Sequence, residues 1–135
     1  MTAIDPARRV VVTGMGVVTP IGTNVPEFWG GLKRGQLGVG PVGGFPVEEL
    51  KILIAAQVKG FEPKVRLKHF KRDKLITLAD RYSWFAAAAA DEAMQMAGLE
   101  GPIANPYRAA CIVGSGAGGL VTFETAYRDL FIHKQ

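Results

Sequence analysis

The stretch that most constrains this chain is a short apolar run followed directly by a cluster of glycines. Residues 109–113 carry no charge, and four of the next six residues are glycine. A further run over residues 120–131 is amphipathic. This order predicts a buried strand, a tight turn and a helix. Because glycine lacks a Cβ, such a turn lets the backbone approach a phosphate, an acyl chain or another backbone segment.

Composition places the chain among ordinary globular proteins. The chain has 135 residues, a length sufficient for one domain with a core. Hydrophobic residues make up 48% and charged residues 21%, which is typical of globular proteins. The longest apolar run, residues 84–90, is too short to span a bilayer, and the N-terminus lacks the apolar centre of a signal peptide. We therefore expect a cytoplasmic protein with no membrane contact.

Segments that favour strands and helices alternate along the chain. The β-branched runs at residues 10–13 and 17–19 predict a strand buried on both faces, which Pro20 and Gly22 end. Residues 52–59 predict a second, weaker strand. Gly14 and Gly16 then indicate a tight turn beside a neighbouring strand rather than a phosphate loop. With residues 109–113, the order predicts an α/β fold, a mainly parallel sheet with packed helices. Three strands that look buried are few, so we expect a part of a larger fold.

Two helices are marked by caps. Asn24 and Glu27 have the spacing of a reciprocal cap, with an apolar face following. Thr77 and Asp80 have the same spacing ahead of residues 82–96. That second segment is rich in alanine, which has the highest helix propensity. Residues 82–96 therefore predict a strong helix.

The glycine cluster also fits a nucleotide-binding pattern. Gly114, Gly116 and Gly119 match G-x-G-x-x-G between an expected strand and an expected helix. The N-terminus of that helix could hold an anion. The fingerprint also needs an acidic residue about twenty positions later, after the next strand, whereas Glu124 and Asp129 fall inside the helix. The pattern favours a structural or acyl-lining turn and leaves nucleotide binding as the alternative.

The sequence offers no catalytic or metal-binding set. Cys111, the only cysteine, lies within the expected strand and is interpreted as an inert packing residue. A single cysteine also excludes an internal disulfide and a multi-cysteine metal site. His69 and His133 have no ligand spacing with other side chains. We expect no metal and no cofactor.

Basic residues are concentrated between residues 64 and 74. They are Lys64, Arg66, Lys68, Lys71, Arg72 and Lys74. Such a run is either a solvated face or a docking surface for an acidic protein or a phosphorylated ligand. No aromatic stacking platform or recognition motif accompanies it, so nucleic acid is not the expected partner.

Four segments together resemble the N-terminal third of the β-ketoacyl-acyl carrier protein synthases, which are condensing enzymes of thiolase fold. They are RRVVVTGMGVVTPIG, NVPEFWGGLKRGQLGVGPV, ADRYSWFAAAAADEAMQMAGL and RAACIVGSGAGGL. The resemblance covers essentially the whole chain, and residues 1–135 would be the N-terminal portion of a ketoacyl-synthase domain. The type II synthases of fatty-acid synthesis look closest, with polyketide and nodulation-type synthases as alternatives.

The resemblance implies a reaction and its partners. In this family a malonyl unit on a carrier protein loses carbon dioxide and attacks an acyl thioester held on a cysteine, and two histidines stabilise the enolate. No position of this sequence matches that Cys-His-His set, so the chain alone is expected to be inactive. Acyl carrier protein is the implied acidic partner, and the full-length enzyme is expected to be a homodimer.

Two sites are carried over from the resemblance. Ala117, between Gly116 and Gly118, resembles the position that lines the acyl pocket near the dimer interface. Relatives often have a larger branched residue there, so the resemblance implies a pocket open to a longer or bulkier chain. The basic run resembles the surface near which carrier protein docks. The docking candidates are Arg66, Lys68, Lys71, Arg72 and Lys74.

Two other functions remain open at this point. One is a dinucleotide-binding α/β domain, and the other is a non-catalytic domain that binds carrier protein. Under the leading interpretation, the isolated chain should expose strand faces that are meant for burial.

Overall fold

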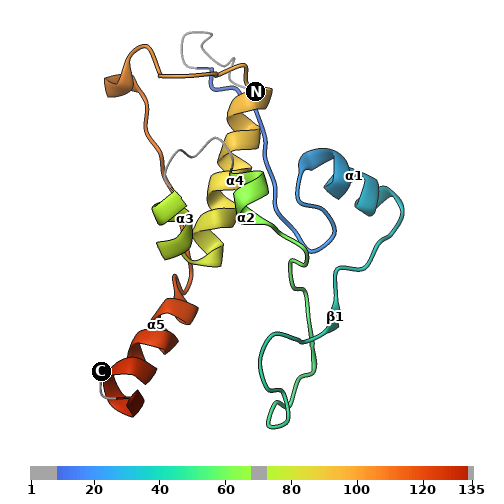
Figure 1. Ribbon diagram of the computed structural model, residues 1–135. Coiled ribbons are helices and arrows are strands. Elements are labelled where there is room, and N and C mark those ends of the chain that lie inside the picture. The colour runs from blue at the N-terminus through green and yellow to red at the C-terminus, as the bar shows by residue number, and fades with distance from the viewer. Residues whose placement is uncertain (1–8, 68–72, 134–135) are drawn as a thin grey trace.

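The computed structural model describes residues 9–67 and 73–133, and the expected basic residues Lys68, Lys71 and Arg72, with His69, lie outside these ranges. Figure 1 shows helix α4 in the middle, between α1 with the β1–β2 ribbon on one side and α3 with α5 on the other. In chain order the elements are α1 (Val25–Lys33), β1 (Gly40–Pro41), β2 (Ile54–Ala55), α2 (Pro63–Arg66), α3 (Asp73–Leu78), α4 (Arg81–Met96), the 3₁₀ turn η2 (Pro106–Arg108), α5 (Leu120–Tyr127) and its π-helical continuation η3 (Arg128–His133).

Helix α1 begins as its cap spacing predicts. The Asn24 side chain accepts a hydrogen bond from the Glu27 amide at 2.9 Å. The returning bond is shifted by one residue, because Glu27 Oε2 accepts from the Thr23 amide at 2.8 Å. The bond from the Glu27 amide satisfies a donor that a helix start leaves without an intrahelical partner, and the bond from the Thr23 amide holds the residue before the cap.

Helix α4 confirms the alanine-rich helix, but its cap differs from the prediction. Asp80 is itself the N-cap, and its side chain accepts from the Arg81 amide. Thr77, expected to begin the capping box, lies instead within α3. The predicted pairing was wrong because a separate short helix ends between the two residues, which places Asp80 at the start of α4 and not in its first turn.

The described residues contain one sheet, of two antiparallel strands that pair Gly40 with Ala55 and Pro41 with Ile54. The predicted strand over residues 52–59 is thus confirmed only at β2, and the expected parallel sheet is absent from this part of the chain. Residues 10–13 and 109–113 lie in non-helical backbone, and neither pairs with a strand in the described ranges. A β-strand requires a neighbouring edge for its N–H and C=O groups.

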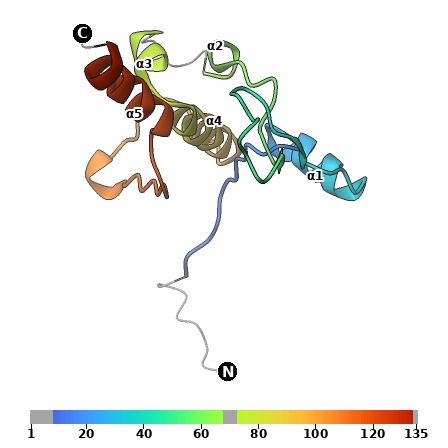
Figure 2. The ribbon, with the colours of Figure 1, turned by 90° about the horizontal axis from the view of Figure 1, so that it is seen from below.

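The core is correspondingly small. Leu67, Ile76 and Ala88 are the buried apolar residues among those described, and α3 and α4 are joined by a bond from the Trp84 indole to the Ile76 carbonyl. By contrast, Val10 and Ile112 are each 93% exposed. In Figure 2 the segment that contains Val10 extends away from the helices. This exposure confirms the prediction that the isolated chain exposes apolar strand faces that are meant for burial.

None of the helices formed by the described residues combines the length and apolar character needed to cross a bilayer.

Candidate functional site

The glycine turn before α5 forms as predicted, although the strand before it does not. Gly118 has φ +65°, a left-handed conformation that favours glycine, and its amide donates to Ser115 Oγ at 3.0 Å. Gly116 and Ala117 are exposed, whereas Gly118 is half-buried. The turn therefore presents the Ala117 methyl group to the surface.

A carboxylate of the chain itself occupies the N-terminus of α5. The Thr122 amide donates to Asp80 Oδ2 at 3.1 Å, and the Thr122 hydroxyl donates to the same oxygen at 2.8 Å. These two bonds, together with a weaker contribution from the Arg81 amide, hold the pKa of Asp80 below that of an ordinary aspartate. The position where the nucleotide-binding interpretation would put a phosphate is thus taken by Asp80 in this structure.

The glycine pair near the N-terminus approaches a helix rather than the neighbouring strand that was expected. A Cβ on Gly14 would overlap the Ala93 carbonyl oxygen, and one on Gly16 would overlap the Ala89 carbonyl oxygen. Ala89 and Ala93 are four residues apart, so they lie on one face of α4. The two glycines therefore let the chain lie directly on the α4 backbone, which leaves no space for a phosphate.

Glu92 is a structurally important residue that sequence reasoning missed. Its carboxylate is half-buried and accepts from the Val25 amide at 2.7 Å and from the Val17 amide at 3.0 Å. Val25 is the first residue of α1, where amides have no partner within the helix. Nothing in the local sequence around Glu92 signals a contact with residues more than sixty positions earlier.

The docking candidates are only partly described. Arg66 is half-buried in α2, and one guanidinium nitrogen donates to the Thr23 carbonyl. Its Nε is buried and has no hydrogen-bond partner within the described ranges. Lys74 lies in α3. The structure therefore shows Arg66 engaged with the segment before α1, while Lys68, Lys71 and Arg72 lie outside the described residues.

Arg66 also affects a nearby carboxylate. The pKa of Glu27 is lowered chiefly by hydrogen bonds from the Thr23 amide and hydroxyl, then by Asn24 and by the charge of Arg66. The guanidinium is thus close enough to Glu27 for its charge to favour the ionised carboxylate.

Cys111 is not packed as predicted. Its thiol is free and exposed, because residues 109–113 lack the neighbouring elements that would cover them. No group of three or more histidine, cysteine or acidic side chains suited to a metal ion occurs among the described residues.

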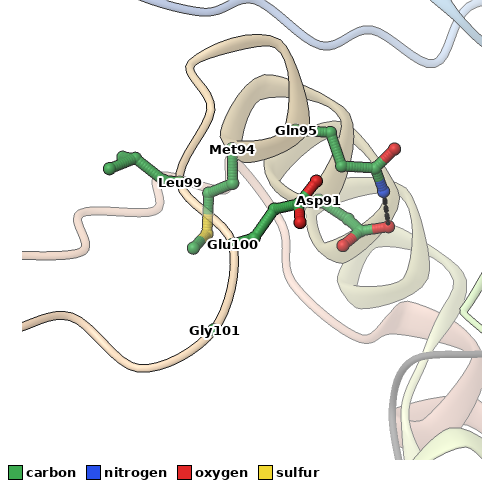
Figure 3. Close-up of a pocket in the computed structure, with 6 residues that line it drawn as sticks. All are labelled: Asp91, Met94, Gln95, Leu99, Glu100 and Gly101. Atoms are coloured by element: carbon green, nitrogen blue, oxygen red, sulfur yellow. Dashed lines mark hydrogen bonds between the residues drawn. The ribbon is translucent and has the colours of Figure 1, made fainter.

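The hollow in Figure 3 lies at the C-terminal end of α4, the opposite end from Asp80. Its volume is about 460 Å³, and Asp91 in its wall accepts a bond from the Gln95 side chain at 2.8 Å. None of the candidate site residues named in the sequence analysis lines it. A second hollow, of about 520 Å³, lies beside the glycine turn and is lined in part by Gly119, Tyr82 and Phe123.

Comparisons with known proteins agree with the resemblance seen in the sequence. The model of the family described as "Beta-ketoacyl synthase, N-terminal domain" matches residues 7–134. The chain is 42% identical over 120 residues to a Streptomyces cyaneus protein described as a polyketide beta-ketoacyl synthase, covering 89% of this chain and 28% of that protein. It is 38% identical to 3-oxoacyl-[acyl-carrier-protein] synthase 2 of Coxiella burnetii (91% and 29% covered). It is 36% identical to Nodulation protein E of Rhizobium sp. strain N33 (93% and 30% covered).

A solved ketosynthase structure is also similar to this chain. The ishigamide ketosynthase/chain length factor superposes with a TM-score of 0.58 and 39% identity, over 68% of this chain and 22% of that one. This likeness supports a thiolase-like α/β fold, of which the described residues form a part. The chain spans less than a third of the length of each of these relatives.

Proposed function

The chain belongs to the β-ketoacyl synthase N-terminal domain family, and from that premise we propose that it is part of a 3-oxoacyl-[acyl-carrier-protein] synthase. Such an enzyme would extend fatty-acid or polyketide chains. The observation that carries the proposal is the family match over residues 7–134, joined by relatives whose names include ketoacyl synthases of both pathways.

The reaction we propose is a decarboxylative Claisen condensation. The malonyl thioester loses carbon dioxide, and the electrons of the broken bond form an enolate. The enolate carbon then attacks the carbonyl of an acyl thioester, and the sulfur of that thioester leaves as a thiolate. Fixed hydrogen-bond donors would stabilise the negative oxygen in both steps. We assign no catalytic residue to this segment and propose that alone it does not catalyse condensation.

We further propose that the glycine turn contributes to the acyl pocket through Gly116, Ala117 and Gly118. The exposure of Ala117 supports the proposal, because its side chain is free to meet a ligand or another segment. The hollow beside Gly119 adds apolar surface next to the turn. A small residue at position 117 would leave space for a long or bulky acyl chain.

The test is Ala117→Phe in the protein that contains this segment. A larger side chain should fill the pocket and shift the preference toward shorter acyl groups, by about tenfold in the ratio of kcat/KM for long and short chains. The matched control is Ala104→Phe, at another exposed loop alanine. Condensing activity with an unchanged chain-length preference would reject the pocket assignment, while a wild-type protein without condensing activity would reject the proposed function.

We also propose a homodimeric enzyme in the cytoplasm that binds an acidic acyl carrier protein through Arg66, Lys68, Lys71, Arg72 and Lys74. The support is their charge and their concentration in one stretch of sequence. Since Arg66 already donates to the Thr23 carbonyl, its replacement would disturb the start of α1 as well as docking. The informative variants are therefore at the other positions.

Charge reversal tests this docking surface. Lys71→Glu combined with Arg72→Glu should weaken binding of acyl carrier protein about tenfold at low salt and less at high salt, because salt screens exposed charges. Lys51→Glu, at an exposed lysine outside the basic run, is the control. Titration calorimetry that finds equal low-salt affinity for the double variant and the wild type would exclude the surface.

A further inference from the structure

Helix α5 is capped by a residue from another part of the chain. Its own N-cap, Gly119, has no side chain to accept a hydrogen bond. Thr122, the third residue of α5, is the usual donor to an N-cap side chain. Here its amide and hydroxyl both donate to Asp80 Oδ2, 42 positions away in sequence. Asp80 therefore supplies the cap that position 119 lacks.

Asp80 performs this role while it caps its own helix. Its Oδ1 accepts from the Arg81 amide at 3.2 Å, and its Oδ2 receives the two Thr122 bonds. One carboxylate thus joins the N-termini of α4 and α5, where the positive ends of both helix dipoles favour a negative charge.

Gly119 makes this contact possible for a steric reason. Its φ is −86°, which other residues adopt readily, so its backbone conformation does not require glycine. A Cβ at this position would lie 2.6 Å from Asp80 Oδ2 and would displace the carboxylate. The last glycine of the cluster is therefore explained by the approach of Asp80, independently of the hydrogen bonds.

The contact fixes the turn as well as the helix. Gly119 adjoins Gly118 at the end of the turn, and Ala117 is two positions before it. No other atoms lie within 4 Å of the Cβ positions of Gly114 and Gly116 in the described structure. The turn is thus loosely surrounded, and Asp80 is the anchor at its α5 end.

We propose that Asp80 is a positioning residue that fixes the glycine turn, and through it Ala117, relative to α4. The inference rests on the proposed function where it concerns the acyl pocket. The contact between Asp80 and Thr122 does not depend on that function. Loss of the contact would let the turn move and would widen the range of acyl groups accepted.

The test compares variants that remove each side of the contact in the protein that contains this segment. Asp80→Ala, which removes both bonds, should reduce the selectivity between long and short acyl chains about threefold or more, and Thr122→Val, which removes the hydroxyl bond and keeps the amide bond, should reduce it less. The double variant should lose no more than Asp80→Ala alone, because the hydroxyl bond is already absent when Asp80 is replaced. Thr122→Ser, which keeps both donors, should behave like the wild type. Asp91→Asn is the control for a carboxylate elsewhere on α4, where it accepts from Gln95.

A second measurement separates this proposal from the proposed function. Amide hydrogen exchange at Thr122 should become about tenfold faster in Asp80→Ala and stay unchanged in Asp91→Asn. If condensation is active but neither selectivity nor exchange responds to Asp80→Ala or Thr122→Val, the positioning role is wrong. If the wild type does not catalyse condensation, the proposed function falls. In that case the exchange rate of the Thr122 amide tests the anchoring role of Asp80 by itself. Faster exchange in Asp80→Ala supports this role, and unchanged exchange overturns it.

Discussion

The glycine pair at residues 14 and 16 and the glycine turn at residues 114–119 follow similar apolar runs but differ in what surrounds them. Gly14 and Gly16 lie against the carbonyl groups of Ala93 and Ala89, with no space for even a methyl group. The turn at residues 114–119 is open on its N-terminal side and is held at its far end by Asp80. The first segment uses glycine for close packing on α4. The second leaves Gly114, Gly116 and Ala117 free to contact something else.

The largest expected effect is the difference between alanine substitutions in the two segments. Gly16→Ala should lower the free energy of unfolding by about 3 kcal/mol, because the added methyl group meets backbone that cannot move aside cheaply. Gly116→Ala should change it by less than about 1 kcal/mol, since its Cβ would enter open space. Chemical denaturation of the protein that contains this segment measures both, and equal losses would show that the two segments are packed alike.

An intermediate effect is expected at Glu92, which adds to the attachment of the N-terminal segment on α4. Glu92→Ala removes the acceptor of the Val17 and Val25 amides and should cost about 2 kcal/mol of unfolding free energy. Glu124→Ala is the control on α5, because its exposed ion pair with Arg128 should be worth about 0.5 kcal/mol or less. A Glu92 variant as stable as the control would mean that these bonds are replaced by water without loss.

The smallest effect concerns the pH dependence of the Asp80 contact. Because the pKa of Asp80 is lowered in the folded chain, its ionised form is stabilised by folding. That stability is fully present above the pKa of an unfolded aspartate and is lost as the pH falls through the lower folded value. Two other charged groups lie near Asp80. Asp129 lines the same hollow, and the Arg81 guanidinium donates to the Val58 carbonyl and not to Asp80.

The protection factor of the Thr122 amide against hydrogen exchange should therefore stay constant from neutral pH into the acid range. It should fall only below the ordinary pKa of aspartate. NMR-detected exchange across this range measures it. Protection that is already lost near neutral pH would indicate that the fold raises the pKa of Asp80, contrary to the hydrogen bonds from Thr122.

Local sequence was sufficient for features that depend on neighbouring residues. The Asn24 cap, the alanine-rich helix and the tight turn with φ +65° at Gly118 all form where the sequence predicts them. Helical hydrogen bonds join residues four positions apart, and a cap or turn needs only a few more. The family could also be identified from the sequence, because the order of these local elements is specific to it.

The tertiary structure decided what depends on distant partners. The strands expected at residues 10–13 and 109–113 remain unpaired in the described chain, and Cys111 is exposed as a result. The contacts of α4 also depend on distant partners, since Glu92 and Asp80 accept hydrogen bonds from amides 67 and 42 positions away. A strand edge or a half-buried carboxylate is stabilised only when its partner is present, and no local pattern specifies that partner. The glycine-rich sequence determined where the chain could turn closely; the packing around it determined that Gly16 meets a helix and that Gly119 meets Asp80.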